Sequence, residues 1–113
     1  TEAIRINPDD AGAYYNRGIA YGKKGQHDKE ISDYTEAIRI DPDYAGAYVN
    51  RGVAYSKKGQ YDKAIADFTE AIRINPDYAM AYNNRCVAYR ELGNLVKADA
   101  DFAKAKELGY EAP

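Results

Sequence analysis

The feature that most constrains the fold is an internal repeat of 34 residues. Three prolines and three tyrosines recur at this spacing. Residues 11–44 are identical to residues 45–78 at 26 of 34 positions, and residues 45–78 are identical to residues 79–112 at 15 of 34. A period of this size is typical of solenoids, in which each unit packs only on its neighbours. We therefore expect three tandem repeats, at 11–44, 45–78 and 79–112.

The first ten residues match the end of a repeat. Residues 1–10 begin TEAIRI, and the same six letters occupy residues 35–40 and 69–74. We therefore expect residues 1–10 to form the end of the second helix of a truncated upstream repeat. Ile4 and Ile6 would then lack the helix that covers their equivalents, which predicts end-to-end self-association through this edge.

The last repeat differs from the others on one face of its second half. Asp99 and Lys106 stand where the earlier repeats carry pairs of isoleucines. They are seven residues apart and so share one helix face. Because a terminal repeat needs a polar outer face, we expect repeat 79–112 to end the array with a polar capping face.

The residue pattern of each repeat predicts a helix hairpin. In the middle repeat, Tyr48, Gly52 and Tyr55 share one face of a first helix, and Ala64 and Phe68 share one face of a second. A glycine separates the two stretches. A proline triplet then ends the second stretch, because proline disfavours helical geometry in the residue before it.

These residues resemble the 34-residue tetratricopeptide repeat family over the whole chain. The resemblance implies an all-α fold, a right-handed superhelical solenoid of antiparallel helix hairpins whose first helices line a concave groove. Glu30 and Cys86 depart from the family pattern, which usually has Ala and a small residue there. The middle repeat carries the pattern as Tyr48, Gly52, Tyr55, Ala64, Phe68, Ala71 and Pro76.

Composition excludes several classes of function. The net charge of -2 and the pI near 5.4 argue against an extensive nucleic-acid surface. No apolar stretch approaches the roughly 18 residues of a membrane helix, so we expect a soluble protein without membrane contacts. A single cysteine excludes a disulfide framework, and no glycine pattern suits phosphate. We expect no metal and no cofactor; the compartment is unknown, with the cytoplasm as the expectation.

Catalytic residues are not expected either. The carboxylates recur with the repeat, as surface charges do, and no pair occupies two contrasting environments as acid-base catalysis requires. His27 is interpreted as a turn residue. Cys86 is interpreted as a small buried residue rather than a reactive thiol.

An arginine recurs on the flank of each first helix. Its stem can cover apolar surface while its head pairs outward. We expect a structural role between repeats, with recurring aspartates as partners; contact with a ligand is the alternative. The arginines are Arg17, Arg51 and Arg85, and the aspartates are Asp33, Asp67 and Asp101.

An asparagine recurs on the face that the resemblance assigns to the groove. Asn16, Asn50 and Asn84 each offer a donor and an acceptor, so a row of them can pair with the main chain of an extended peptide. In the alternative, each amide bonds its own helix backbone. Asparagine is a poor residue for a helix interior, which favours the peptide-binding role. The remaining residues expected at this peptide-binding face are Tyr15, Ile19, Val49, Val53, Asn83 and Val87.

Members of the family also bind C-terminal carboxylates of chaperone tails through a basic clamp. Of the five places that the clamp would occupy, only Asn50 matches. We therefore expect no such clamp in this chain. The five places read Tyr15, Ile19, Asn50, Met80 and Asn84.

Two functions remain. The first is a protein-protein interaction module that binds an extended peptide in the concave groove. The alternative is a structural scaffold, or a self-associating segment of a larger or designed repeat protein.

Overall fold

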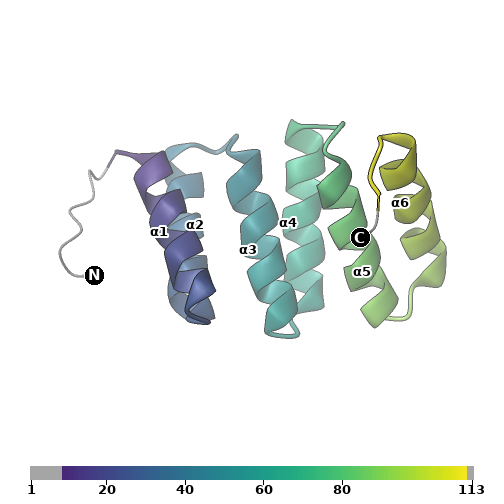
Figure 1. The fold of residues 1–113 in the computed structure, drawn as a ribbon, viewed down its shortest axis with the longest axis horizontal. Helices are drawn as coiled ribbons and strands as arrows, with labels where there is room; N and C mark the ends of the chain where they lie inside the picture. The colour runs from purple at the N-terminus through teal and green to yellow at the C-terminus, as the bar shows by residue number, and fades with distance from the viewer. Residues whose placement is uncertain (1–8, 112–113) are drawn as a thin grey trace.

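The computed structural model describes residues 9–111, which form six α-helices and no strand. Figure 1 shows the helices side by side in chain order, with neighbours antiparallel, in a body of 46 × 25 × 24 Å. The all-α solenoid predicted from the sequence is confirmed. The helices are α1 (Ala11–Lys23), α2 (His27–Ile40), α3 (Ala45–Lys57), α4 (Tyr61–Ile74), α5 (Ala79–Glu91) and α6 (Leu95–Glu107).

Local signals set the helix ends. Asp10 caps α1, because its carboxylate accepts a hydrogen bond from the backbone N–H of Ala13 at 3.0 Å. The α3–α4 turn contains Gly59 at φ +76°, a conformation that L side chains rarely adopt. Asn75, which precedes Pro76, has an extended φ of -133°, so α4 stops there.

Glycine lets the two helices of a hairpin approach closely. A Cβ placed on Gly52 would lie 2.5 Å from the ring of Phe68, and one on Gly18 would lie 2.6 Å from the ring of Tyr34. Both rings are only 1% exposed. The second helix therefore packs its ring directly against the backbone of the first.

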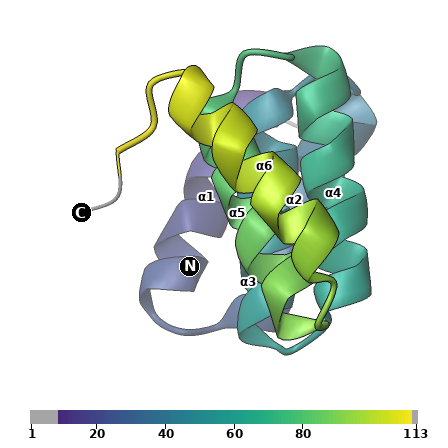
Figure 2. The ribbon, with the colours of Figure 1, turned by 90° about the vertical axis from the view of Figure 1, so that its right-hand side faces the viewer.

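The third hairpin lacks this arrangement. Cys86 replaces the glycine and is fully buried, which confirms it as a small packing residue. The ring of Phe102 is 37% exposed, and Val96 is 81% exposed. Asp99 and Lys106 are exposed on the same helix, where no later helix packs in the described part of the chain. Figure 2 shows this end, with α6 in front. A natural end of the array at this helix stays a prediction.

Paired arginines and aspartates join the helices of each hairpin. In every repeat the guanidinium donates two hydrogen bonds to a buried carboxylate, at 2.7 to 2.9 Å. The pairing expected for these arginines is confirmed, but each pair lies within one repeat rather than between repeats. Arg51 and Arg85 also reach the preceding repeat, through the hydroxyls of Thr35 and Thr69. None of the three arginines is left unpaired for a ligand. The pairs are Arg17 with Asp33, Arg51 with Asp67 and Arg85 with Asp101.

The predicted N-terminal edge lies outside the described residues. Ile4 and Ile6 belong to residues 1–8, so self-association through them stays a prediction. None of the six helices in residues 9–111 is both long and apolar enough to cross a membrane.

Candidate functional site

The candidate site lies on α1, α3 and α5, on the sides of these helices that carry the recurring asparagines. We call this surface the groove face. Asn16 is exposed, while Asn50 and Asn84 are half-buried. Ile19 and Val53 are half-buried as well, and the remaining members of the predicted set are described below.

The amide of Asn50 makes a specific contact with the preceding repeat. Its Nδ2 donates to the hydroxyl of Tyr15 at 3.1 Å, which links α3 to α1. Within residues 9–111 none of the three recurring amides bonds the backbone of its own helix, so the alternative role given above is not supported. The amide also lies close to the hydroxyl of Tyr34, where it partly offsets the raised pKa of that group, so Oδ1 remains for other partners.

Asn83 binds the end of the chain. Its Nδ2 donates to the hydroxyl of Tyr110 at 3.1 Å, so the segment after α6 returns to α5. This contact occupies one amide hydrogen of Asn83. The side chain is half-buried and remains beside the groove face.

Val49 departs from the prediction. Its side chain is 1% exposed and packs in the core with Phe68 and Ala81. The helical-wheel position is correct for the groove face, but the close approach of α5 covers it. Val49 is therefore excluded from the contact surface.

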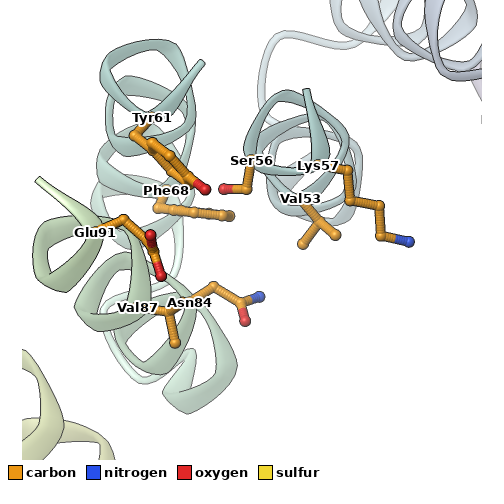
Figure 3. A pocket seen from close by; sticks show the side chains of 8 residues that line it. All are labelled: Val53, Ser56, Lys57, Tyr61, Phe68, Asn84, Val87 and Glu91. Carbon is orange, nitrogen blue, oxygen red and sulfur yellow. The ribbon is translucent and has the colours of Figure 1, made fainter. Parts of the chain in front are cut away.

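A pocket of 270 Å³ opens between α3 and α5, with α4 as its floor. Figure 3 shows the ring of Phe68 at the base, and Val53 and Val87 on opposite walls. The polar lining residues are Ser56, Lys57, Tyr61, Asn84 and Glu91.

The polar side chains of the pocket point in different directions. In Figure 3 the carboxylate of Glu91 points into the space between Phe68 and Val87, whereas the amine of Lys57 points away from it. The hydroxyls of Ser56 and Tyr61 point toward each other above the Phe68 ring.

The pocket unites three predicted residues with five that the sequence did not indicate. Val53, Asn84 and Val87 were predicted, and Val87 is 46% exposed. Lys57 and Glu91 could have been found, since they share the last groove-facing position of their helices. Ser56 lies on the side of α3 that packs against α4, while Tyr61 and Phe68 lie in α4 itself. Only the packing of the helices brings these three to the pocket. The five additional residues are Ser56, Lys57, Tyr61, Phe68 and Glu91.

The equivalent place between α1 and α3 has different chemistry. Glu30 is buried there and contacts Nδ1 of His27 at 2.8 Å through one carboxylate oxygen. Tyr34 donates its hydroxyl to the other oxygen at 3.2 Å. Burial raises the pKa of Tyr34, and the charge of Glu30 adds to the shift. This carboxylate is already satisfied, so the place is polar and internally bonded.

The described residues show no group of three or more His, Cys, Asp and Glu side chains arranged to hold a metal. The one cysteine is buried, and burial raises the pKa of its thiol, so Cys86 does not present a thiolate at neutral pH. The groove face therefore offers hydrogen bonds, apolar contact and one inward-pointing carboxylate.

Comparison with known proteins gives a consistent result. A family model described as tetratricopeptide repeat matches residues 45–78, and a second, described as TPR repeat, matches residues 1–25 and 23–59. No significant match is found among curated proteins.

Solved structures resemble the chain closely. The second TPR of Spaghetti (RPAP3), bound to the HSP90 peptide SRMEEVD, is 33% identical with a TM-score of 0.87, over 90% of this chain and 94% of that one. MamA is 32% identical with a TM-score of 0.88, over 90% of this chain but only 60% of MamA. The Arabidopsis OM64 TPR domain is 31% identical with a TM-score of 0.88, over 92% and 86% of the two chains.

Proposed function

The chain belongs to the tetratricopeptide repeat family, and from this premise we propose that it is a protein-interaction module whose groove face binds an extended peptide. The pocket between α3 and α5 is the observation that carries the proposal, because it gives a bound chain a place for a side chain beside the amide of Asn84. The relative RPAP3 has a peptide on its own tetratricopeptide domain.

Main-chain recognition is proposed for the three recurring asparagines. An extended peptide exposes its N–H and C=O groups, which an amide side chain can bond whatever the peptide sequence. Asn50 retains the acceptor Oδ1 beside the contacts that its amide makes with the hydroxyls of Tyr15 and Tyr34. Each such bond contributes about 0.5 to 1.5 kcal/mol, so side-chain contacts must add affinity. The proposed contact set is Asn16, Asn50, Asn84, Tyr15, Ile19, Val53, Asn83 and Val87.

The proposed ligand differs from the acidic peptide bound by RPAP3. A clamp for terminal carboxylates needs basic side chains, yet Tyr15, Ile19 and Met80 are uncharged. The remaining two places are asparagines. We propose that acidic chaperone tails are not the ligands of these repeats.

Catalysis is not part of the proposal. Proteins of this family are generally non-catalytic interaction modules. In the described part of the chain, the buried aspartates are paired with arginines and Glu30 is bonded to His27 and Tyr34. These carboxylates are occupied by structural contacts, which supports a binding role.

Selection from a displayed library of random peptides tests the proposal. Peptides enriched on the wild-type chain would be synthesised and titrated by fluorescence anisotropy. The triple variant Asn16→Ala, Asn50→Ala, Asn84→Ala should lose about tenfold or more in affinity, because it removes three sites of main-chain bonding.

A matched triple variant controls for general effects. Ser32→Ala, Ala66→Ser and Ala100→Ser alter one equivalent exposed position on α2, α4 and α6, away from the groove face. This variant should bind as the wild type does. Circular dichroism would show that both variants keep the wild-type helix content. Equal affinity of the asparagine variant and the wild type would refute the proposed contact set.

A further inference from the structure

The pocket between α3 and α5 has a more specific chemistry than an apolar hollow. Building on the proposed function, we propose that it binds one basic side chain, lysine or arginine, of the extended peptide. The proposal rests on a divided lining, which combines apolar side chains with the carboxylate of the exposed Glu91, a group that points toward the pocket and has no partner among residues 9–111.

The apolar part of the lining suits the stem of such a side chain. Val53 and Val87 face each other across the pocket, and the ring of Phe68 forms the base. Lysine and arginine carry three or four methylenes, which gain by covering apolar surface while the charged head stays at a polar site. These three side chains therefore offer the stem apolar contact.

The polar part suits the charged head. Glu91 forms no ion pair or hydrogen bond with any side chain in the described part of the chain, and its carboxylate points toward the pocket. The hydroxyls of Ser56 and Tyr61 lie across the Phe68 ring from this carboxylate and line the same pocket, where they can accept hydrogen bonds from an ammonium or guanidinium. Lys57 directs its amine away, so the nearest positive charge does not oppose the head.

The volume also favours a side chain over a free small molecule. Pockets for small ligands usually measure about 300 to 1,000 Å³. This pocket holds 270 Å³ and opens onto the groove face. A purely aliphatic side chain would fill the walls but would cover the carboxylate of Glu91 without compensating its lost hydration, which is unfavourable.

The neighbouring place between α1 and α3 cannot serve in the same way. The residue that corresponds to Glu91 there is Lys57, 34 positions earlier. The carboxylate of Glu30 is already bonded to His27 and Tyr34. Of the two sites between repeats, only the one between α3 and α5 therefore suits a basic side chain. Binding of that side chain fixes the register of the peptide along the groove face.

A side-chain analogue tests the pocket without any peptide. We would titrate n-butylammonium chloride, which mimics the lysine side chain, into the ¹⁵N-labelled chain and follow backbone amide shifts. Saturable shifts are expected at Val53, Ser56, Phe68 and Val87. 1-Butanol has the same stem without the charge and should bind about three- to tenfold more weakly.

Two variants identify the carboxylate responsible. Glu91→Gln keeps the size of the side chain and should weaken n-butylammonium by about three- to tenfold while leaving 1-butanol unchanged. Lys57→Gln also changes one charge on the pocket wall and should not weaken binding. Thermal unfolding would verify that both variants are folded. Equal binding of the two analogues, an unchanged affinity of Glu91→Gln, or no saturable shift at the pocket would each overturn the assignment.

The peptide selection described above separates this inference from the proposed function. Enriched peptides should carry Lys or Arg at one fixed position, and Glu91→Lys should replace this preference with Asp or Glu. Enrichment of aliphatic residues at that position would overturn the basic-side-chain assignment and leave peptide binding intact. Failure to enrich any peptide would refute the proposed function, while the analogue titration would still decide the chemistry of the pocket.

Discussion

Arg51 and Asp67 form a two-point ion pair between α3 and α4, with Nε to Oδ2 at 2.8 Å and Nη2 to Oδ1 at 2.7 Å. The remaining Nη1 donates to the hydroxyl of Thr35 on α2 at 3.1 Å. The guanidinium also lies 5.7 and 5.8 Å from the ring centres of Tyr48 and Tyr55. One side chain thus joins its own hairpin to the preceding repeat and helps hold α1 and α3 in register along the groove face.

This ion pair should be important for stability. Asp67 is 5% exposed, so Arg51→Ala leaves a buried carboxylate without its partner. We expect a loss of about 3 kcal/mol in the free energy of unfolding, measured by urea denaturation. Arg73→Ala is the control, because Arg73 pairs with Glu70 at the exposed surface and should change stability much less than Arg51→Ala does. Similar losses in the two variants would contradict the structural role of Arg51.

Two glycine substitutions should have opposite effects on the free energy of unfolding, because only one of the glycines lies against a buried ring. Gly52→Ala places a Cβ 2.5 Å from the buried Phe68 ring and should destabilise the chain by about 1 to 3 kcal/mol. Gly12→Ala meets only an ordinary contact with Asp10 at 3.4 Å and should stabilise α1 by up to about 1 kcal/mol. Thermal and urea unfolding would measure both. A neutral Gly52→Ala would show that the ring can move aside freely.

The buried pair of Glu30 and Tyr34 predicts strong coupling. Tyr34→Phe removes the hydroxyl that donates to Glu30 and should cost about 1 to 3 kcal/mol. The same change should cost less when Glu30→Ala is already present, because the hydroxyl then has no carboxylate to bond. The next repeat already carries this combination, with Ala64 and Phe68 at the positions of Glu30 and Tyr34. A double-mutant cycle in urea should therefore give a coupling of about 0.5 kcal/mol or more. Additive effects would mean that the hydroxyl and the carboxylate do not stabilise each other.

Cys86 should be unreactive in the folded chain. The thiol is buried, and burial raises its pKa. We expect reaction with Ellman's reagent at pH 8 to be at least about tenfold slower than in the guanidinium-unfolded chain. Rapid labelling under native conditions would contradict the burial of this side chain.

The raised pKa of Cys86 also predicts the sign of a pH effect. The fold favours the neutral thiol, so the contribution of Cys86 to stability is fully present below the unfolded thiol pKa of about 8.5. It is lost as the pH rises through the higher folded value. The difference in unfolding free energy between wild type and Cys86→Ala should therefore shrink above about pH 8.5. A difference that stays constant up to pH 10 would contradict the shift.

Much of the architecture could be predicted from local sequence. The 34-residue period and the glycine and proline positions predict the helical hairpins, because helix formation depends on residues three and four apart and on the residues at the ends. The recurring Arg51 and Asp67 were also paired correctly. Their spacing of 16 residues repeats in every unit, so any contact in one hairpin is expected in all.

The candidate site could be predicted only in part. Val49 has the correct helical-wheel position for the groove face but is covered when α5 packs on α3. Phe68 was expected to pack on one face of its helix and Tyr61 was given no role, yet both line the pocket. Whether these side chains reach the pocket depends on the distance between α3 and α5, which a single-helix pattern does not contain.

The sequence by itself determined the helices, their pairing into hairpins and the face that carries the three asparagines, because these features follow from short-range periodicity repeated along the chain. Only the tertiary structure decided which side chains reach that face. The carboxylate of Glu91 points into an open pocket, while that of Glu30 is held by two neighbours. The physical reason is that side-chain burial and pairing depend on contacts between different helices, and small differences in residue size there decide whether a space is filled or left open.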